Sequence, residues 1–168
     1  MVGSLPASEI NRIVVMGVAG CGKSTVAEAL AEALDARYLD GDAFHPPENI
    51  DKMSQGVPLT DADRWPWLDA VAEGFGDQPT VIACSALRRA YRDRLRARGD
   101  VFFAFLDGSF ELIQGRMAAR AGHFMPESLL ESQFATLEPP AADEWSVAAD
   151  ISGETEATVA QILHALGR

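Results

Sequence analysis

Gly17-Val18-Ala19-Gly20-Cys21-Gly22-Lys23-Ser24 follows a short apolar run in this chain, and the octapeptide is a complete Walker A phosphate-binding motif. Residues 13–16 before it have the apolar character of a buried strand, and the residues after it, up to position 34, have the pattern of a helix. A glycine-rich loop between a strand and a helix is the context in which this motif binds phosphate. The sequence therefore predicts an α/β fold with a nucleoside triphosphate site.

The chemistry of the loop follows from its residue types. Glycines allow successive main-chain N–H groups to turn toward a phosphate, and the start of the next helix adds unpaired amides and a favourable dipole. Lys23 supplies a mobile positive charge for the outer phosphates, and the Ser24 hydroxyl can ligate Mg²⁺. A glycine-rich turn that binds nothing is disfavoured, because loop, lysine, hydroxyl and flanking elements agree. The expected nucleotide-binding residues here are Gly17, Val18, Ala19, Gly20, Cys21, Gly22, Lys23, Ser24 and Thr25.

The size and charge of the chain narrow its class. Its 168 residues suit one domain, which we place at residues 12–168 after a short flexible lead-in at residues 1–11. The formal net charge of −11 argues against a nucleic-acid partner, because phosphate backbones are bound by clustered Lys and Arg. The sequence has no basic leader and no apolar run of about 20 residues. We therefore expect a cytoplasmic protein without a membrane partner, with Cys21 and Cys84 as reduced thiols.

Apolar runs alternate with amphipathic segments along the chain, which predicts a parallel sheet with helices on both faces. We expect Thr60 with Asp63, Ser85 and Ser109 to cap helices. Two irregular stretches, residues 40–59 and 121–126, are expected to frame a ligand site at the carboxyl ends of the strands. The predicted strands are residues 13–16, 37–39, 79–84, 100–106 and 147–151, and the predicted helices are residues 24–34, 61–75, 87–98, 110–120, 126–137 and 155–166.

Two carboxylates follow the second predicted strand, in Asp40-Gly41-Asp42. Phosphoryl transfer needs an oxygen ligand for Mg²⁺ and a group that orients and deprotonates the attacking hydroxyl. We assign Asp40 to Mg²⁺ and Asp42 to the acceptor hydroxyl. An Asp-Gly turn with solvated carboxylates is the alternative, and the neighbouring phosphate loop disfavours it. Asp107, at the end of an apolar run, is a rival metal ligand or a residue that caps the following turn.

Long segments outside the loop carry a family resemblance. The segments are His45-Pro46-Pro47-Glu48-Asn49-Ile50-Asp51-Lys52-Met53, Gly56-Val57-Pro58-Leu59, Thr60-Asp61-Ala62-Asp63-Arg64-Trp65-Pro66-Trp67-Leu68, Cys84-Ser85-Ala86-Leu87-Arg88-Arg89-Ala90-Tyr91-Arg92-Asp93, Arg116, Arg120, Gly122-His123-Phe124-Met125 and Ser132-Gln133-Phe134-Ala135-Thr136-Leu137-Glu138-Pro139. With the phosphate loop they resemble the bacterial-type gluconokinases, small P-loop enzymes that phosphorylate D-gluconate, over roughly residues 12–167.

The resemblance implies a three-layer P-loop kinase fold akin to shikimate and nucleoside monophosphate kinases, with a five-stranded parallel sheet, a small lid and commonly a homodimer. It implies ATP and Mg²⁺ as cofactors and transfer of the γ-phosphate to the 6-hydroxyl of gluconate. Ala19 and Cys21 depart from the Ser or Gly that such kinases often carry. Both are small and the loop works through its main chain, so ATP binding is still expected. A thiol beside phosphate suggests sensitivity to oxidation as a hypothesis.

An acid acceptor needs cations for its carboxylate, and the planar guanidinium of Arg suits this better than Lys. In the acceptor segment, about residues 42–68, we favour Arg64, with Arg88 or Arg89 as a second contact. A solvated helix face is the alternative for most of Arg88, Arg89, Arg92, Arg94 and Arg96. Trp65-Pro66-Trp67 is expected to pack in the interior, because an open-chain acid has no flat face to stack on. The expected polyol contacts are Asp42, His45, Asn49 and Lys52.

Arg116 and Arg120 share one helix face before the interruption, which we interpret as a lid over about residues 116–127. By analogy with related kinases, Arg116 is expected near the base and Arg120 on the transferring phosphoryl group, where it stabilises charge. A surface helix with two solvated arginines is the alternative. Two other functions stay open: a sister kinase for shikimate or another sugar acid, and a nucleotide-dependent switch or ATPase without an acceptor.

Overall fold

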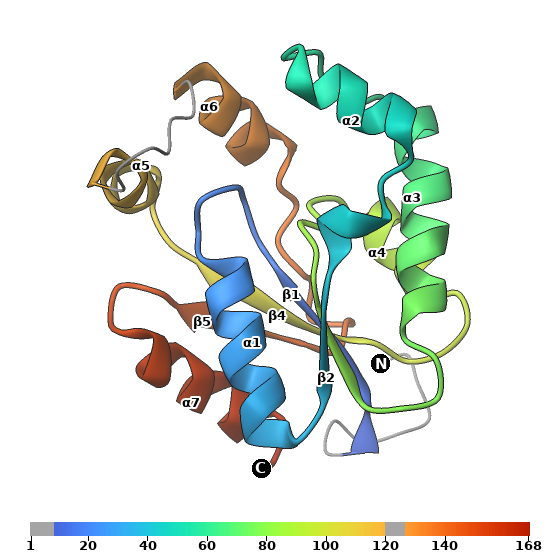
Figure 1. The fold of residues 1–168 in the computed structure, drawn as a ribbon. Helices are drawn as coiled ribbons and strands as arrows, with labels where there is room; N and C mark the ends of the chain where they lie inside the picture. Colours follow the sequence, from blue (N-terminus) through green and yellow to red (C-terminus); the bar gives the residue numbers. More distant parts are fainter. Residues whose placement is uncertain (1–8, 120–126) are drawn as a thin grey trace.

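The computed structural model describes residues 9–119 and 127–168, and its centre is one parallel sheet with strand order β2-β3-β1-β4-β5 (Figure 1). Every neighbouring pair of strands is parallel. The strands are β1 (Arg12–Met16), β2 (Arg37–Asp40), β3 (Thr80–Ala83), β4 (Phe102–Asp107) and β5 (Ser146–Asp150). The helices are α1 (Lys23–Leu34), η2 (Gly41–Phe44), α2 (Pro47–Ser54), α3 (Asp61–Gly74), α4 (Arg89–Leu95), α5 (Phe110–Ala119), α6 (Glu127–Thr136) and α7 (Thr155–Ala165).

Two hydrophobic clusters cover the two faces of the sheet. On β1, Val15 packs toward the face that α1 and α7 cover, while Val14 and Met16 pack toward the face of α3 and α4. The alternation follows from the pleat of a strand, which sends successive side chains to opposite faces. Figure 1 shows α1 and α7 together on one side of the sheet and α3 with α4 on the other. The three-layer architecture expected from the alternating sequence pattern is confirmed.

The predicted elements agree with the structure except in three places. Residues 40–59 were expected to be irregular, yet they contain η2 and α2. Pro47 opens α2, where the missing proline N–H costs nothing, so the proline starts a helix here and does not interrupt one. The expected cap at Ser85 is wrong, because α4 begins later, after Arg88. Ile10 is buried in the core, so residues 9–11 are part of the folded domain and not of a flexible lead-in.

The other caps agree with the sequence prediction. Thr60 and Asp63 form a reciprocal capping box at the start of α3. The Ser109 hydroxyl accepts the main-chain N–H of Leu112 at 3.1 Å in the first turn of α5. Residues 121–126 lie outside the described residues. Among residues 9–119 and 127–168, no helix is long and apolar enough to span a membrane.

The carboxyl ends of β1, β2 and β3 bring the sequence motifs together. Asp40 at the end of β2 pairs in register with Ala83 of β3, which in turn pairs with Val15 of β1. The N–H of Gly17 donates to the carbonyl of Ser85 at 3.2 Å, which ties the phosphate loop to the loop after β3. Glycine is required at position 41, because a Cβ there would lie 2.5 Å from the carbonyl oxygen of Ala83.

Candidate active site

The phosphate loop has the curvature that an anion site needs. Gly20 and Gly22 have φ angles of 81° and 93°, a left-handed conformation that residues with a Cβ rarely adopt. Gly22 is the N-cap of α1, so the first amides of that helix face the concave side of the loop. The Lys23 ammonium donates to the carbonyls of Gly17 and Val18 at 3.1 and 3.0 Å. These contacts place the lysine charge over the loop.

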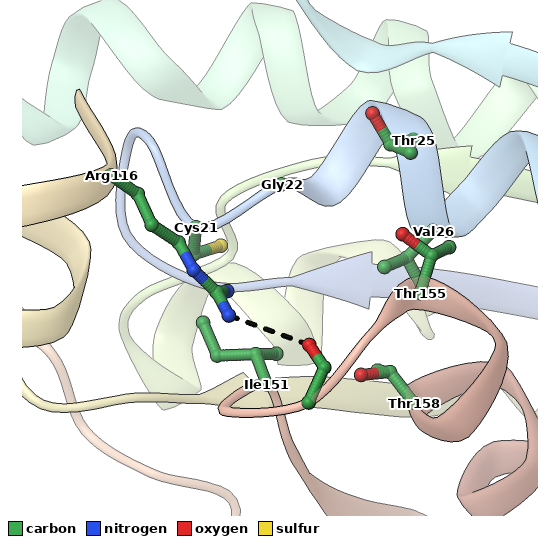
Figure 2. Close-up of a pocket in the computed structure, with 9 residues that line it drawn as sticks. Cys21, Gly22, Thr25, Val26, Arg116, Ile151, Thr155 and Thr158 are labelled. Carbon is green, nitrogen blue, oxygen red and sulfur yellow. Dashed lines mark hydrogen bonds between the residues drawn. The ribbon is translucent and has the colours of Figure 1, made fainter. Parts of the chain in front are cut away.

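A pocket lies beside the loop, between α1, α5 and the turn after β5 (Figure 2). Arg116 reaches across it from α5 and donates to the carbonyl of Gly153 at 3.4 Å. Arg116, predicted for the nucleotide base, is therefore adjacent to the phosphate loop. Arg120, its predicted partner, lies outside the described residues. The pocket is lined by Cys21, Gly22, Thr25, Val26, Arg116, Ile151, Gly153, Thr155 and Thr158.

Cys21 is a residue of the phosphate loop, and its side chain is buried although it contributes to the lining of this pocket. Its burial raises the pKa of the thiol, and the nearby Lys23 charge opposes that shift only in part. A thiol with a raised pKa contains little thiolate at neutral pH, and thiolate is the form that oxidants attack. The geometry therefore favours an inert, space-filling role for Cys21.

The two aspartates after β2 lie in a turn that three contacts define. The Asp40 carboxylate caps η2 by accepting the N–H of Asp42 at 3.0 Å. The Trp67 indole donates to the carbonyl of Gly41 at 2.8 Å from the neighbouring helix α3. The Asp42 side chain is 83% exposed and lies 4.0 Å from the ring of His45. Asp42 is thus presented to solvent at the carboxyl edge of the sheet, where an acceptor can reach it.

His45 is held in one orientation by its neighbours. Its ring stacks on Trp67 with centroids 4.1 Å apart, and burial lowers the pKa of the imidazole. The side-chain amide of Asn49 donates to the Asp63 carbonyl, which identifies its nitrogen, and that nitrogen also lies 3.2 Å from Nδ1 of His45. Nδ1 must then accept, so the neutral ring carries its proton on Nε2, which is the nitrogen that faces Asp42.

Asn49 and Lys52, both predicted to contact the polyol, have partners within the protein. Asn49 is 2% exposed and joins α2 to the start of α3. The Lys52 ammonium lies 2.8 Å from the carboxylate of Asp63, the residue that also closes the capping box with Thr60. The Lys52 hydrogen bond and the Thr60 amide lower the pKa of Asp63 to about 2. The structure therefore gives both residues a role in holding α2 against α3.

Arg64 and Arg88 converge, although they come from different segments. Each guanidinium lies 3.7 Å from the carboxylate of Asp61, Arg64 from within α3 and Arg88 from the loop after β3. The Tyr91 hydroxyl donates to Asp61 at 2.6 Å, and Arg64 lies over the Tyr91 ring. Two cations around one carboxylate leave this cluster with one net positive charge. Asp61 and Tyr91 were missed in the sequence, because nothing in their spacing shows that Arg88 joins Arg64.

The alternative of a solvated arginine face at α4 fails at Arg92 and Arg96, whereas Arg94 is exposed in a pair with Asp69. Arg92 and Glu144 form a fully buried ion pair, with 2.8 Å between Nε and Oε1, and Arg92 also donates to the Ala86 carbonyl. Arg96 binds the same carboxylate at 2.8 Å. Arg89, a predicted acceptor contact, instead forms a two-pronged pair with Asp143 at 2.8 and 2.6 Å. Arg89, Arg92 and Arg96 thus anchor the loop before β5. Of the two residues predicted as a second contact for the acceptor, Arg88 joins the Arg64 cluster and Arg89 does not.

Comparison with known proteins agrees with this geometry. A family model described as shikimate kinase matches residues 19–166. A phosphate loop at the carboxyl edge of a five-stranded parallel sheet, together with this match, places the chain in the class of P-loop small-molecule kinases.

Three relatives define the family within that class. The gluconokinase of Gluconobacter oxydans is 50% identical over 143 residues, which are 79% of this chain and 78% of the relative. The thermoresistant gluconokinase of Escherichia coli is 45% identical over 160 residues, 91% of each chain. A crystal structure of a gluconokinase from Sinorhizobium meliloti superposes with a TM-score of 0.88 at 52% identity, over 94% of this chain and 91% of that one. The chain belongs to the gluconokinase family.

Proposed function

We propose that this protein transfers the γ-phosphate of ATP to the 6-hydroxyl of D-gluconate, giving 6-phospho-D-gluconate and ADP. The observation that carries the proposal is the convergence of Arg64 and Arg88 on Asp61, together with the exposed Asp42 that the turn after β2 presents. A cationic pair suits the carboxylate of a sugar acid, and a carboxylate at the sheet edge suits its reacting hydroxyl. Family membership supplies the particular acid, because the relatives are named gluconokinases.

The nucleotide is proposed to bind along the phosphate loop, with its base in the pocket beside Arg116. The loop amides and the start of α1 bind the phosphates, and Lys23 moves from the carbonyls of Gly17 and Val18 to the outer phosphates. Arg116 spans the pocket by donating to the carbonyl of Gly153, where its guanidinium can contact the nucleotide base. Arg120 and the lid proposed over about residues 116–127 are expectations from the sequence, and most of that segment lies outside the described residues.

Mg²⁺ fits the oxygen donors near the loop. Ser24 lies in the first turn of α1 and supplies a hydroxyl oxygen. The Asp40 carboxylate uses one oxygen to cap η2, which leaves its second oxygen for a metal ion. In the part of the chain that the structure describes, no group of three or more acidic, His or Cys side chains forms a cage for a metal ion. Protein Mg²⁺ in phosphoryl transfer is commonly bound by one or two side chains together with phosphates and water, so Ser24 and Asp40 suffice. When bound, the ion neutralises charge on the β- and γ-phosphates.

Asp42 is the proposed general base. Its carboxylate is exposed, so an acceptor hydroxyl can approach it and transfer its proton to it as the oxygen attacks phosphorus. The Nε2 proton of neutral His45 faces Asp42 and can orient that carboxylate or bind a neighbouring hydroxyl of the acceptor. The main contribution of these side chains is to position the acceptor, because phosphoryl transfer depends mainly on alignment and charge stabilisation.

The acceptor carboxylate is proposed to bind Arg64 and Arg88, with Asp61 holding both guanidinium groups in place. The cluster carries two positive charges and one negative charge, so one further carboxylate neutralises it. This balance suits a monoacid such as gluconate. We also propose a cytoplasmic homodimer, which rests on the family resemblance and is tested by light scattering of the purified protein.

A steady-state ADP-release assay with a panel of acceptors tests the proposed function. The panel is gluconate, shikimate, a second sugar acid, and AMP, each with ATP and Mg²⁺. We expect turnover that depends on gluconate, with the other acceptors at least about tenfold less efficient in kcat/KM, as expected for substrates that leave buried polar groups unpaired. Preference for shikimate or another sugar acid would assign the chain to a sister kinase. ATP hydrolysis that no acceptor stimulates would indicate a switch or ATPase.

A further inference from the structure

We propose that Gln133 of α6 is a positioning residue that fixes the phosphate loop for catalysis, an inference that rests on the proposed kinase function. The Gln133 side-chain oxygen accepts the main-chain N–H of Ala19 at 2.6 Å, between residues 114 positions apart in the sequence. This hydrogen bond is the direct link from α6 to the phosphate-binding loop. Neither the Walker A motif nor the acceptor site explains why a glutamine of a distant helix lies there.

The bond completes a set of contacts that hold the first half of the loop. The Lys23 ammonium donates to the main-chain carbonyls of Gly17 and Val18. The Gln133 side-chain oxygen accepts the main-chain N–H of the next residue, Ala19. The amides that follow belong to the part of the loop that curves toward α1. The Val18 carbonyl and the Ala19 N–H belong to one planar peptide unit, so the bonds from Lys23 and to Gln133 together fix the orientation of that plane at the start of the phosphate-binding turn.

Helix α5 supports the same turn from its own side. The Met117 side chain of α5 lies against Gly20, where it occupies the space that a Cβ at this position would take. Helices α5 and α6 are themselves joined by an edge-to-face contact between Phe110 and Phe134, with ring centroids 5.7 Å apart. Gln133 therefore projects from a packed pair of helices that contacts the loop at two successive residues. Figure 1 shows α5 and α6 at the loop end of the sheet.

The choice of glutamine has a chemical reason. A glutamate would accept the Ala19 N–H more strongly, because charge-assisted hydrogen bonds are the stronger ones. It would also place a negative charge close to the bound polyphosphate, which Coulomb repulsion disfavours. Glutamine supplies the acceptor without the charge. The two roles, acceptor and neutrality, can be separated by substitution.

Three variants of the full-length protein test the proposal: Gln133→Leu, Gln133→Glu and, as a matched control, Gln78→Leu on an exposed loop far from the site. The measurements are kcat and KM with gluconate, binding of a non-hydrolysable ATP analogue by calorimetry, amide exchange of Ala19 by NMR, and thermal unfolding. The exchange and binding measurements need no turnover, so they report on Gln133 even if the proposed acceptor is wrong.

For Gln133→Leu we expect kcat to fall about tenfold to a hundredfold, the range for misplaced reacting groups. We expect analogue binding to change less than about threefold and Ala19 exchange to accelerate at least about tenfold, since one hydrogen bond is lost. Gln133→Glu should restore slow Ala19 exchange and part of kcat, but bind the analogue more weakly than wild type. Gln78→Leu should match wild type throughout.

Equal Ala19 exchange in wild type and Gln133→Leu would overturn the proposal, because the hydrogen bond would then not order the loop. A Gln133→Leu enzyme with wild-type kcat but reduced thermal stability would also overturn it, by showing a purely structural role. If wild type itself shows no gluconate-dependent turnover, the proposed function fails. The role of Gln133 is then tested by two measurements that need no turnover: faster Ala19 amide exchange in Gln133→Leu and weaker analogue binding by Gln133→Glu would support it, and the absence of either effect would contradict it.

Discussion

Trp67 donates its indole N–H to the main-chain carbonyl of Gly41 at 2.8 Å, and this bond joins the buried face of α3 to the turn that carries Asp40 and Asp42. Trp67 also stacks on His45, which in turn faces Asp42. One buried side chain thus supports the turn of both aspartates, Asp40 proposed for Mg²⁺ and Asp42 proposed for the acceptor.

Trp67→Phe keeps an aromatic ring against His45 but removes the donor to Gly41. We expect kcat to fall about tenfold because Asp42 is less well positioned, with about 1 kcal/mol lost from the free energy of unfolding. Steady-state kinetics and denaturant unfolding measure the two effects. Trp145→Phe is the control, because the indole N–H of Trp145 is buried without a hydrogen-bond partner among the described residues and its ring packs in the other hydrophobic cluster. Equal kinetic losses in the two variants would contradict a specific role for the Gly41 contact.

Asp42→Asn removes the proposed base and preserves the shape of the side chain. We expect kcat to fall about 10² to 10⁴-fold, the usual range for general-base catalysis, while calorimetric binding of the ATP analogue persists. Asp51→Asn on the exposed face of α2 is the control. A kcat within a few-fold of wild type would remove Asp42 from the base role and leave alignment as the main contribution of the site.

Arg64→Lys keeps the positive charge but loses the planar fork. We expect KM for gluconate to rise at least about tenfold while KM for ATP stays the same, because a guanidinium binds a carboxylate through two parallel hydrogen bonds. Arg94→Lys, on the exposed pair with Asp69, is the matched control and should leave both constants unchanged. If KM for ATP rose as much as KM for gluconate, Arg64 would be acting through the fold and not through the acceptor.

The buried pair of Arg92 and Glu144 is expected to dominate acid stability. Removing one partner by Glu144→Gln leaves a buried arginine poorly compensated and should cost about 3–5 kcal/mol at pH 7. The hydrogen bonds of Arg92 and of the Ala141 amide outweigh burial and lower the pKa of Glu144 to about 2 in the folded state.

The sign of the pH effect follows from this depressed pKa. The stabilisation is complete above the ordinary glutamate pKa of 4.5, and it is lost as the pH falls from there toward about 2. Urea unfolding at several pH values should therefore show the gap between wild type and Glu144→Gln narrowing over this range. Glu73→Gln, in an exposed pair with Arg98, should cost at most about 1 kcal/mol at pH 7. A pH-independent gap would refute the assignment of stability to the Glu144 charge.

Neither cysteine is expected to react in the native protein. Burial raises the pKa of Cys84 to about 12 and raises the pKa of Cys21 as well, so thiolate is scarce at neutral pH. Titration with a thiol reagent should modify both residues only after denaturation. Peroxide should affect the activity of wild type and Cys21→Ser equally. Rapid loss of activity in wild type alone would show that Cys21 is the oxidation-sensitive site that its place in the loop first suggested.

The sequence predicts best where local pattern and chemistry coincide. The phosphate loop, the five strands and the Thr60 capping box depend on residues close together in the chain, and each was identified correctly. Contacts between distant residues were not predictable. Arg92 forms a buried ion pair with Glu144, 52 positions away in the sequence, although its spacing on α4 is typical of a solvated helix face. Gln133 accepts a hydrogen bond from Ala19, 114 positions away in the sequence, and no sequence periodicity predicts such a contact.

The acceptor residues show the same division. Arg64 was singled out in the sequence as the first cation for the acceptor, and this stays a prediction. Its partnership with Arg88 depends on how the loop after β3 approaches α3. Asn49 and Lys52 have the polar chemistry of ligand contacts, and the structure uses that chemistry to join α2 to α3. Polarity alone therefore did not separate contacts within the protein from contacts to a substrate.

Identification of the product tests the central claim most directly. Wild-type protein is incubated with ATP, Mg²⁺ and gluconate, and the products are analysed by phosphorus–proton correlated NMR. We expect one new phosphomonoester whose phosphorus couples to the protons on carbon 6 of gluconate, formed in equal amount to ADP. A phosphate on another oxygen, or ADP and inorganic phosphate without a gluconate ester, would contradict the claim that this chain phosphorylates gluconate at the 6-hydroxyl.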